Sequence, residues 1–405
     1  TQYTSRNMPH AMTTAETIEL ESALEIPTYS KMPMALVEGE GSVVWDAEGN
    51  RYLDFYGGHC VALLGHCPPR VVEAVQQQAS ELLFYSNVAH SPIRAQAAKR
   101  LADLAPEGLG NVFFANSGSE ANETALKLAR KHTGRSKVVA LEGAFHGRTT
   151  GALAITHSET YRKPYLDVLP ETHFVPWGDH EALEAALAPG DVAAVILEPI
   201  QSIAGMRMMP RVCGPGLREW CDEHGTMLIF DEVQTGVGRT GTFSISEFYG
   251  ITPDLITLAK SLGAGVPVSA VLVHDAIAAG VEPGDQGSTF GGGMLAMAAV
   301  NACLQTIVAD DLMERATAIH EQVHALVGPH VEAVRGKGCL MGLAFDRPVQ
   351  PIIDGLRDHG VLAGSSADPH VMRIMPPLTV TDAEVQQFAD ALIAVLHDTS
   401  TPEVA

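Results

Sequence analysis

Apolar and polar residues alternate from Ser42 to Phe55 in the run SVVWDAEGNRYLDF, which turns at Glu48-Gly49-Asn50. This pattern is typical of a β-hairpin. Helical spacing follows in VVEAVQQQASELL and again after Ser91-Pro92, where serine suits the N-cap and proline the first helical position. The sequence therefore predicts a small sheet and two helices ahead of the first core strand.

Short apolar runs then alternate with helical stretches. The runs are NVFFA, KVVAL, DVAAVIL, MLIF and LITLA, separated by segments such as ANETALKLARKH and GPGLREWCDEHG. This rhythm predicts an α/β fold with a mostly parallel sheet flanked by helices. From about Asp311 the pattern changes to a helix, a strand-like segment over residues 338–345 and a last helix opened by the capping box Thr381 to Glu384. That part predicts a smaller α+β unit.

No repeat or long linker interrupts the chain, so the units should be packed against each other. We expect residues 1–62 to form an N-terminal segment that contributes to the small unit. Residues 63–310 should form the large domain, and residues 311–405 the C-terminal small domain.

The composition is that of a compact enzyme, with 46% hydrophobic and 18% charged residues among 405. A formal charge of −22 would repel nucleic acid and anionic lipid. The six cysteines form no CxxC pair, and the first twenty residues lack the basic start and apolar core of a signal peptide. The apolar run from Leu262 to Val273 is too short for a membrane span. We therefore expect a cytoplasmic protein that binds neither nucleic acid nor membrane.

Polar residues follow several of the apolar runs directly. Asn116-Ser117-Gly118-Ser119-Glu120 follows NVFFA, Glu198 follows DVAAVIL, Asp231 follows MLIF and Lys260 follows LITLA. In a parallel sheet the ligand crevice lies at the carboxyl ends of the strands. The sequence therefore predicts that these groups meet at one edge.

The loop with Ser117, Gly118 and Ser119 precedes a helix and offers backbone N–H groups, two hydroxyls and the positive end of the helix dipole. These features suit one phosphate, although the loop lacks a Walker lysine. Taken alone, the loop would be interpreted more simply as a plain N-cap.

Asp231 ends an apolar strand, where an unpaired carboxylate is costly to bury, so a cation should face it. A protonated pyridine nitrogen would do so, whereas a strand-end aspartate that caps a turn is the simpler alternative. Lys260 also closes an apolar strand, and desolvation would favour the neutral amine that a Schiff base needs. Its simpler alternative is a salt bridge to Asp231 without a cofactor.

Two other motifs carry less weight. The segment Gly236 to Gly241 matches GxGxxG, but the residues after it do not open a helix, which argues against a dinucleotide site. The doublets His59-Cys60 and His66-Cys67 lack a second half-site, and we expect no metal there.

With these residues in place, the chain resembles the class III pyridoxal-phosphate aminotransferases of fold type I, nearest the acetylornithine and ornithine branch. The resemblance runs over nearly the whole chain. It is carried by GEGSVVWDAEGNRYLDFYGG, LGHCPPRVVEAV, FFANSGSEANETALKLAR, AFHGRTTGALAIT, VILEPIQ, LIFDEVQTGVGRTG, PDLITLAKSLGAGVP, STFGG and VMRIMPPLTVT.

The resemblance implies pyridoxal 5'-phosphate (PLP) as cofactor and a homodimer. It implies that Lys260 forms the Schiff base, that Asp231 pairs with the pyridine nitrogen and that Gln234 approaches the ring hydroxyl. It also implies roles for six further residues: Val233 and Phe145 as the faces around the ring, Ser117, Gly118 and Ser119 at the phosphate, and Thr289 at the phosphate of the other subunit's cofactor.

For substrates, the resemblance implies that Arg148 and Arg373 bind carboxylates, as suits 2-oxoglutarate. Ser288 joins them in the expected substrate site. Glu198 is expected to pair with Arg373 while an ω-amino donor is bound. The implied reaction is a ping-pong transfer in which the freed Lys260 is also the base.

The chain departs from its relatives where the donor enters. The usual QGE after EPI is replaced by Gln201, Ser202 and Ile203, and STFGG is followed by Gly293-Met294 in place of Asn-Pro. His59 and Cys60 differ as well. We expect the ω-amine of acetylornithine, ornithine or a lysine derivative as donor. The alternatives are an aminomutase or racemase, a 4-aminobutyrate-type or amine transaminase, and a non-catalytic PLP-binding regulator.

Overall fold

The large sheet positions every strand-end residue singled out above. The computed structural model describes residues 12–398, and in it a seven-stranded sheet has the order β4-β12-β11-β10-β7-β5-β6. Its strands are β4 (Asn111–Ala115), β5 (Lys137–Leu141), β6 (Thr172–Val175), β7 (Val192–Leu197), β10 (Met227–Asp231), β11 (Leu255–Leu258) and β12 (Ser269–Val273). All neighbours are parallel except β12, which pairs antiparallel with both β11 and β4. The predicted mostly parallel α/β sheet is confirmed.

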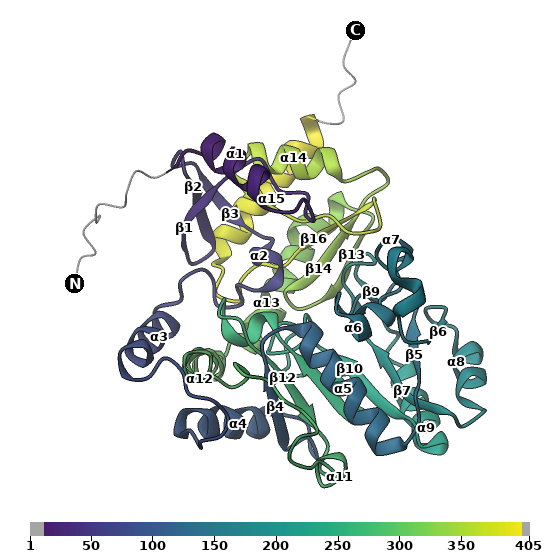
Figure 1. Ribbon diagram of the computed structural model, residues 1–405. Helices are drawn as coiled ribbons and strands as arrows, with labels where there is room; N and C mark the ends of the chain where they lie inside the picture. The colour runs from purple at the N-terminus through teal and green to yellow at the C-terminus, as the bar shows by residue number, and fades with distance from the viewer. Residues whose placement is uncertain (1–11, 399–405) are drawn as a thin grey trace.

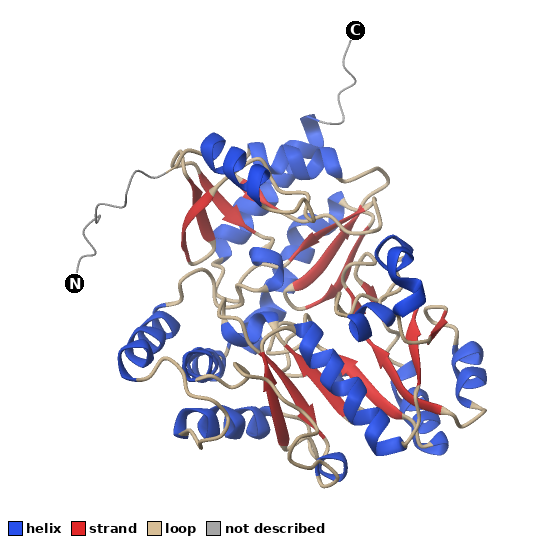
Figure 2. Cartoon of the chain, in the orientation of Figure 1, coloured by secondary structure: helices blue, strands red, loops and turns tan. Residues whose placement is uncertain are grey.

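Helices cover both faces of this sheet (Figures 1 and 2). The long α5 crosses β10, β11 and β12, while α9 packs on β10 and α8 on β6. The helices of this unit are α3 (Pro69–Glu81), α4 (Pro92–Leu104), α5 (Gly118–Thr133), α6 (Thr150–Ala154), α7 (Glu159–Arg162), α8 (His180–Leu187), α9 (Cys213–His224), α10 (Ser246–Tyr249), α11 (Asp275–Ala278) and α12 (Met294–Ala309). Between β7 and α9 lies a short hairpin of β8 (Ile200–Gln201) and β9 (Arg207–Met208).

The predicted helix starts are close to the observed ones. Helix α5 begins at Gly118, because Ser117 occupies the N-cap and its hydroxyl accepts the N–H of Glu120. Pro92 opens α4 with Ser91 at the N-cap, but the Ser91 side chain makes no capping hydrogen bond. Serine there supplies the N-cap position without the expected bond.

A second unit is built from both ends of the described chain (Figure 1). Its four-stranded sheet has the order β1-β2-β3-β15, and its three-stranded sheet the order β13-β14-β16. The elements are α1 (Thr14–Leu24), β1 (Leu36–Glu40), β2 (Val43–Asp46), β3 (Arg51–Asp54), α2 (Gly57–Cys60), α13 (Leu312–Val327), β13 (Ala333–Lys337), β14 (Leu340–Ala344), α14 (Gln350–Asp358), β15 (Val361–Leu362), β16 (Val371–Ile374) and α15 (Asp382–Asp398).

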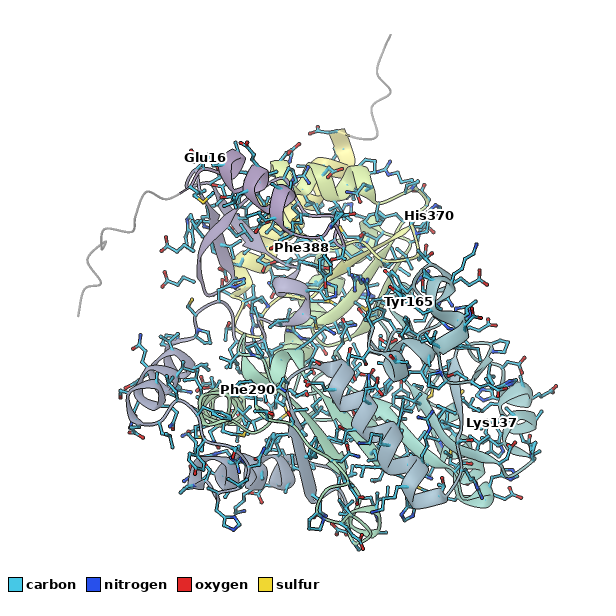
Figure 3. All side chains as sticks on the ribbon, viewed as in Figure 1. Glu16, Lys137, Tyr165, Phe290, His370 and Phe388 are labelled. Carbon is cyan, nitrogen blue, oxygen red and sulfur yellow. The ribbon has the colours of Figure 1, made fainter. Side chains whose placement is uncertain are left out.

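The predicted hairpin is present as β2 and β3, paired antiparallel through Val43 and Leu53. The strand β15 then adds in parallel to β3, so that residues near the two ends of the chain share one sheet. Phe55 stacks on Phe388 of α15 with ring centroids 4.3 Å apart, inside this unit (Figure 3). Strands β1 to β3 thus lie in the small unit, residues 1–11 fall outside the described part of the chain, and the division at residues 62 and 310 stays a prediction.

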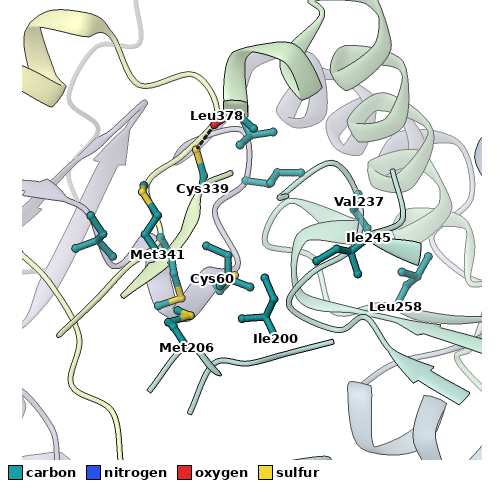
Figure 4. Packing of buried hydrophobic residues seen from close by; sticks show 14 of the residues in the cluster. Cys60, Ile200, Met206, Val237, Ile245, Leu258, Cys339, Met341 and Leu378 are labelled. Carbon is teal, nitrogen blue, oxygen red and sulfur yellow. Dashed lines mark hydrogen bonds between the residues drawn. The ribbon is translucent and has the colours of Figure 1, made fainter. Parts of the chain in front are cut away.

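One buried cluster continues from the small unit into the large one. Cys60, Cys339, Met341 and Leu378 face Ile200, Met206, Val237, Ile245 and Leu258 (Figure 4). Because apolar side chains are shared across the junction, the two units are packed, as expected. Within residues 12–398 no single helix is both long and apolar enough to cross a membrane, although α12 with the segment Leu312–His330 meets both criteria as a pair bent by 66°.

Candidate active site

A cavity of about 380 Å³ opens at the carboxyl ends of the large sheet's strands. Groups from five strand ends line it: the loop after β4, the segment after β5, Glu198 after β7, Asp231 and the turn after β10, and Lys260 after β11. The predicted convergence at one sheet edge is therefore present. Most of the predicted cofactor residues border this cavity, namely Ser117, Gly118, Ser119, Phe145, Asp231, Val233, Gln234 and Lys260.

Lys260 lies partly buried just past the end of β11, in a strained conformation. Its φ of 37° lies in the left-handed region, which non-glycine residues adopt at a cost of about 1–3 kcal/mol. Burial lowers the pKa of its amine, and the charges of Asp231 and Glu198 oppose that shift. No ion pair joins Lys260 to Asp231 within residues 12–398, so the simple salt-bridge alternative is not found. The amine is left available to the cavity.

Asp231 has partners that the sequence did not predict. Its Oδ2 atom accepts hydrogen bonds from Nδ1 of His146 at 2.7 Å and from Nδ2 of Asn122 at 2.8 Å, while Oδ1 accepts the N–H of Val233 at 3.0 Å. Thr257 in turn donates to the Asn122 carbonyl oxygen at 2.8 Å. Three hydrogen bonds thus hold the Asp231 carboxylate in place without any cation.

The sequence gives little indication that His146 and Asn122 contact Asp231. His146 directly follows Phe145, and Asn122 lies one turn into the helix after the serine loop. Their role depends on where β5 and α5 bring them, and helical or strand periodicity does not show that. Asn122 is a polar residue in the first buried turn of a helix, beside a carboxylate at a strand end. A search for that pattern could have identified it.

Two buried polar atoms at the cavity have no partner. They are Oε1 of Gln234 and Nε2 of His146. Buried polar atoms in native proteins are nearly always hydrogen bonded, so each of these atoms calls for a ligand or a bound water. The resemblance implies that Gln234 approaches a cofactor hydroxyl, and this stays a prediction.

The loop at the start of α5 leaves room for a group at the helix N-terminus. A side chain at Gly118 would bring its Cβ to 3.1 Å from both methyl groups of Val233. The Ser119 hydroxyl accepts the backbone N–H of Arg148 at 3.4 Å. Ser117 does cap the helix, as the simpler alternative proposed, but the loop also borders the cavity, so capping and anion binding are compatible here.

These features fit PLP. Gly118 and the α5 N-terminus suit a phosphate, Val233 and Phe145 both border the space for a flat ring, and Asp231 and Gln234 offer acceptors to ring substituents. Lys260 supplies a partly buried amine with a lowered pKa, as such a cofactor needs.

The two arginines occupy different settings. Arg373 is buried on β16, with its Nε donating to the Ser365 carbonyl oxygen at 2.6 Å and its Nη1 to the Ser202 hydroxyl at 3.2 Å. Arg148 is exposed and lies over the Tyr161 ring, 4.2 Å from the centroid, with Tyr29 at 6.0 Å. Arg148 is therefore a surface group beside the serine loop, and Arg373 an internal one.

Glu198 is buried, and within residues 12–398 it forms an ion pair with neither Arg148 nor Arg373. Its Oε1 accepts the N–H of Phe145 at 2.9 Å, and no ion pair joins it to Arg373 in the described part of the chain. Burial raises the pKa of its carboxyl to about 7. The predicted pairing with Arg373 concerns the donor-bound state and stays a prediction.

A left-handed turn, Gly57 to Cys60, faces the arginine on β16. All four residues have a positive φ, from 55° to 67°. Tyr56 lies under the Arg373 guanidinium, 5.8 Å from ring centroid to Cζ, and its hydroxyl bonds to Nδ1 of His59. Burial, with the charges of Arg373 and Lys260, lowers the pKa of His59 to about 4, so the imidazole is neutral.

Neither Ser288 nor Thr289 lines the cavity of its own chain, although Ser288 contacts a residue that does. Ser288 accepts hydrogen bonds from Nδ2 of Asn116 at 3.1 Å and from the N–H of Gly291 at 3.0 Å. Thr289 is exposed. Its expected place at another subunit's cofactor is not tested by one chain.

The other two motifs have structural roles. Residues 236–241 form turns, and the next helix, α10, begins only at Ser246, so no helix N-terminus follows the glycines as a dinucleotide site requires. Nε2 of His66 pairs with Asp54 at 2.8 Å. Among residues 12–398, no group of three or more His, Cys, Asp and Glu side chains could hold a metal ion, and all six cysteines are free.

Comparisons with known proteins agree on the family. The sequence profile of aminotransferase class-III matches residues 26–396. An acetylornithine aminotransferase of Methanopyrus kandleri is 45% identical over 386 residues, covering 93% of this chain and 98% of that protein. The structure is similar to an acetylornithine aminotransferase from Elizabethkingia anophelis, with a TM-score of 0.83 at 30% identity over 96% of this chain and 100% of the other.

A second solved structure is an ornithine aminotransferase from Toxoplasma gondii, crystallised with partial occupancy of PLP at its active site. It matches with a TM-score of 0.88 at 29% identity, over 94% of each chain. The fold-type prediction and the aminotransferase prediction are both confirmed. The chain belongs to the class-III aminotransferase family and is a PLP-dependent aminotransferase.

Proposed function

We propose that this enzyme moves the ω-amino group of N-acetylornithine, ornithine or a lysine derivative to 2-oxoglutarate in a ping-pong reaction, with PLP held on Lys260. The observation that carries the proposal is the partly buried Lys260, which lines a cavity bordered by Asp231 and the start of α5 and whose amine has a lowered pKa. The names of the similar relatives, acetylornithine and ornithine aminotransferases, supply the donor class.

Each part of the cofactor has a matching group in this chain. Ser117, Gly118 and Ser119 would hold the phosphate with the α5 N-terminus. Asp231 would accept from the pyridine nitrogen, and Gln234 would bond the ring hydroxyl with its unpartnered oxygen. Val233 and Phe145 would cover the two ring faces. When bound, PLP supplies an electron sink for negative charge on the donor carbon.

Lys260 would then move the proton. Burial lowers the pKa of its amine, so that the neutral form, which can accept a proton, is more populated than for an exposed lysine. General-base catalysis by a positioned side chain contributes about 10²–10⁴ in rate. Lys260 therefore serves as cofactor anchor and as base.

The two arginines divide the substrate carboxylates. Arg148, exposed beside the serine loop, would bind the carboxylate far from the reacting carbon. Arg373 would bind the carboxylate next to the reacting carbon of 2-oxoglutarate or glutamate. Ser288 borders the Asn116 side chain at the rim and would complete the site.

We also infer a homodimer in a cytoplasmic location. Exposed apolar residues gather near the rim on α3 and the segment after it and on the STFGG loop: Val72, Leu82, Leu83, Phe84, Tyr85, Val88 and Phe290. The Phe84 and Phe290 rings lie 5.0 Å apart, and Phe290 is 64% exposed. A patch of this kind favours a protein partner, and Thr289 beside it would reach the partner's cofactor. Six free cysteines fit a reducing compartment.

The test combines cofactor mapping with a donor screen. Borohydride reduction followed by peptide mass analysis should place the PLP adduct on Lys260. N-acetylornithine, ornithine, acylated lysine and 4-aminobutyrate are then each offered with 2-oxoglutarate, and glutamate formation is measured. An adduct on another lysine would contradict the cofactor site. Turnover of a single amino acid without any need for an oxo acid would favour a mutase or racemase.

A further inference from the structure

The short helix α6, which follows Arg148, has no N-terminal cap from its own residues. Thr149 occupies the N-cap position, but its side chain accepts no N–H of the helix. The backbone N–H groups of Gly151 and Ala152 donate instead to Oε1 of Glu123 on α5, at 2.7 and 3.3 Å. An N-cap side chain would normally accept from these positions. Glu123 therefore caps α6 from a neighbouring helix.

The same carboxylate holds the residue next to Arg148. The Thr149 hydroxyl donates to Oε1 of Glu123 at 2.7 Å. On the other side, the backbone N–H of Arg148 itself donates to the Ser119 hydroxyl at 3.4 Å. Ser119 and Glu123 are four residues apart on α5, so they lie on one face of that helix. The backbone around Arg148 is thus held by α5 at two points.

Glycine occupies the position where each of these contacts brings the chain close to α5. A Cβ at Gly151 would overlap the Glu123 carboxylate, and a Cβ at Gly147 would overlap the Ser119 hydroxyl. Gly147 also has a φ of 130°, which residues with a side chain rarely adopt. The segment on either side of Arg148 therefore lies against α5 as closely as a backbone can.

The Arg148 side chain has no anchor of comparable strength. It is exposed, and its guanidinium lies over the Tyr161 ring, 4.2 Å from the centroid. Within residues 12–398, no carboxylate forms an ion pair with it. A long side chain without a charged partner keeps much of its rotational freedom, so the space it can reach is set mainly by its backbone. The contacts of α5 with that backbone therefore decide where the guanidinium can bind an anion.

We propose that Glu123 is a positioning residue for Arg148, and so for the substrate carboxylate that lies far from the reacting carbon. Glu123 keeps the Arg148 backbone at a fixed place relative to the start of α5, which borders the cavity. A carboxylate bound by Arg148 is then held at a fixed distance from the proposed phosphate site. This inference rests on the proposed function, in which Arg148 binds that carboxylate.

The test is a double-mutant cycle of Glu123→Ala and Arg148→Ala in the holoenzyme, with glutarate as the binding probe. Glutarate has two carboxylates but neither an amine nor an oxo group, so calorimetry measures its dissociation constant without turnover. Glu123→Ala should weaken glutarate binding roughly tenfold, because the backbone that directs Arg148 loses its hydrogen bonds to a charged group. In the Arg148→Ala background the same change should have less than about a twofold effect, since the residue through which Glu123 acts is gone.

Two further variants separate placement of Arg148 from a general loss of structure. Glu123→Gln keeps an oxygen that can accept the same hydrogen bonds, so it should restore most of the lost affinity. Arg130→Ala is the matched control on the same helix, because the Arg130 Nε donates to the Ser136 carbonyl oxygen at 3.1 Å, at the other end of α5. It should leave glutarate binding close to wild type.

Steady-state kinetics give an independent readout. Both 2-oxoglutarate and the ω-amino donor carry a carboxylate far from the reacting carbon, so Glu123→Ala should raise KM for both by similar factors. The value of kcat should stay nearly unchanged, because the lost interaction holds the bound substrate equally before and during reaction. If Glu123→Ala does not fold, Thr149→Val removes one of the hydrogen bonds to Glu123 and should weaken glutarate binding by about threefold.

The inference fails if Glu123→Ala leaves glutarate affinity unchanged, or if its effect is as large in the Arg148→Ala background as in wild type. Either result, combined with weaker glutarate binding in Arg148→Ala alone, would leave the proposed function standing. Unchanged glutarate binding in Arg148→Ala would refute the proposed role of Arg148 and the inference with it.

Discussion

Nδ1 of His146 lies 2.7 Å from Oδ2 of Asp231, and both side chains are buried. A carboxylate only accepts hydrogen bonds, so the imidazole donates. His146 thereby fixes the oxygen that Asn122 also contacts. His146 and Asn122 therefore set the position of the Asp231 carboxylate. Through that position they affect how strongly Asp231 would bind a pyridine nitrogen, although they lie outside the cofactor's own contacts.

The variant His146→Ala should bind PLP about 10- to 100-fold more weakly, because a hydrogen bond to a buried charged group contributes about 1.5–3 kcal/mol. Cofactor affinity can be measured by equilibrium dialysis of the apoenzyme with PLP. His157→Ala is the control, since the His157 ring packs on Phe174 and not on Asp231. Equal affinities for the two variants would contradict a role for His146 in holding the carboxylate.

Lys260→Ala should abolish the borohydride-stable adduct and reduce turnover by at least about 100-fold, because it removes both the cofactor anchor and the general base. Lys137→Ala is the matched control. Its amine pairs with Asp191 at 3.3 Å at the far end of β5, well away from the cavity (Figure 3). Mass analysis and steady-state rates check the two effects separately. Retention of the adduct in Lys260→Ala would disprove the assignment.

Glu198 should make the cofactor-free protein less stable as the pH rises. Burial raises the pKa of its folded-state carboxyl from 4.5 to about 7, so the folded state holds the proton where the unfolded state has lost it. Stability then falls between pH 4.5 and 7, and the penalty is complete above pH 7.

Glu198→Gln removes this titration while keeping an oxygen that can accept the Phe145 N–H. The free energy of unfolding of the variant relative to wild type should therefore rise from pH 4.5 to pH 8 by up to about 3 kcal/mol. Urea denaturation of the apoenzyme at both pH values measures it. The exposed Glu223→Gln is the control, and a pH-independent difference for Glu198→Gln would show that its carboxyl ionises normally.

The proposed dimer should weaken when its apolar patch is made polar. Phe290→Ser removes an exposed ring that contacts Phe84, so the dimer dissociation constant should rise, by about tenfold or more if Phe290 is buried between subunits. Light scattering over a dilution series measures it. Val212→Ser, which removes an exposed apolar side chain on the loop before α9, is the control. A fully active monomer would overturn both the dimer and the shared role of Thr289.

The sequence identified several residues that line the cavity, whereas their chemical roles stay predictions. Strand-end residues such as Asp231 and Lys260 could be found because apolar runs and the polar residues after them are adjacent in sequence. Their convergence followed from one rule about parallel sheets. The short strands β6 and β12 were not predicted, since β12 lies inside a run broken by glycine and proline.

Partners that come from distant segments could not be predicted. Tyr56, Ser202 and Ser365 meet Arg373 only because the β8–β9 turn and the loop before β16 are brought together in space. Of the departures noted near the donor entrance, Met294 instead lies buried at the start of α12, with its sulfur accepting the N–H of Tyr85 at 3.3 Å. The periodicity of apolar residues identifies helices and strands, but it does not show which loops contact each other.

The pairing of β15 with β3 bears on how the protein is made. Val361 pairs with Leu53 across about three quarters of the sequence, and closing such a long loop is entropically costly and slow. During synthesis, the N-terminal hairpin leaves the ribosome long before its neighbouring strand exists. The edge of β3 that later pairs with β15 therefore stays exposed while the large sheet forms. Newly made chains should therefore depend on chaperones, or on slow translation, to keep that edge from pairing with another chain.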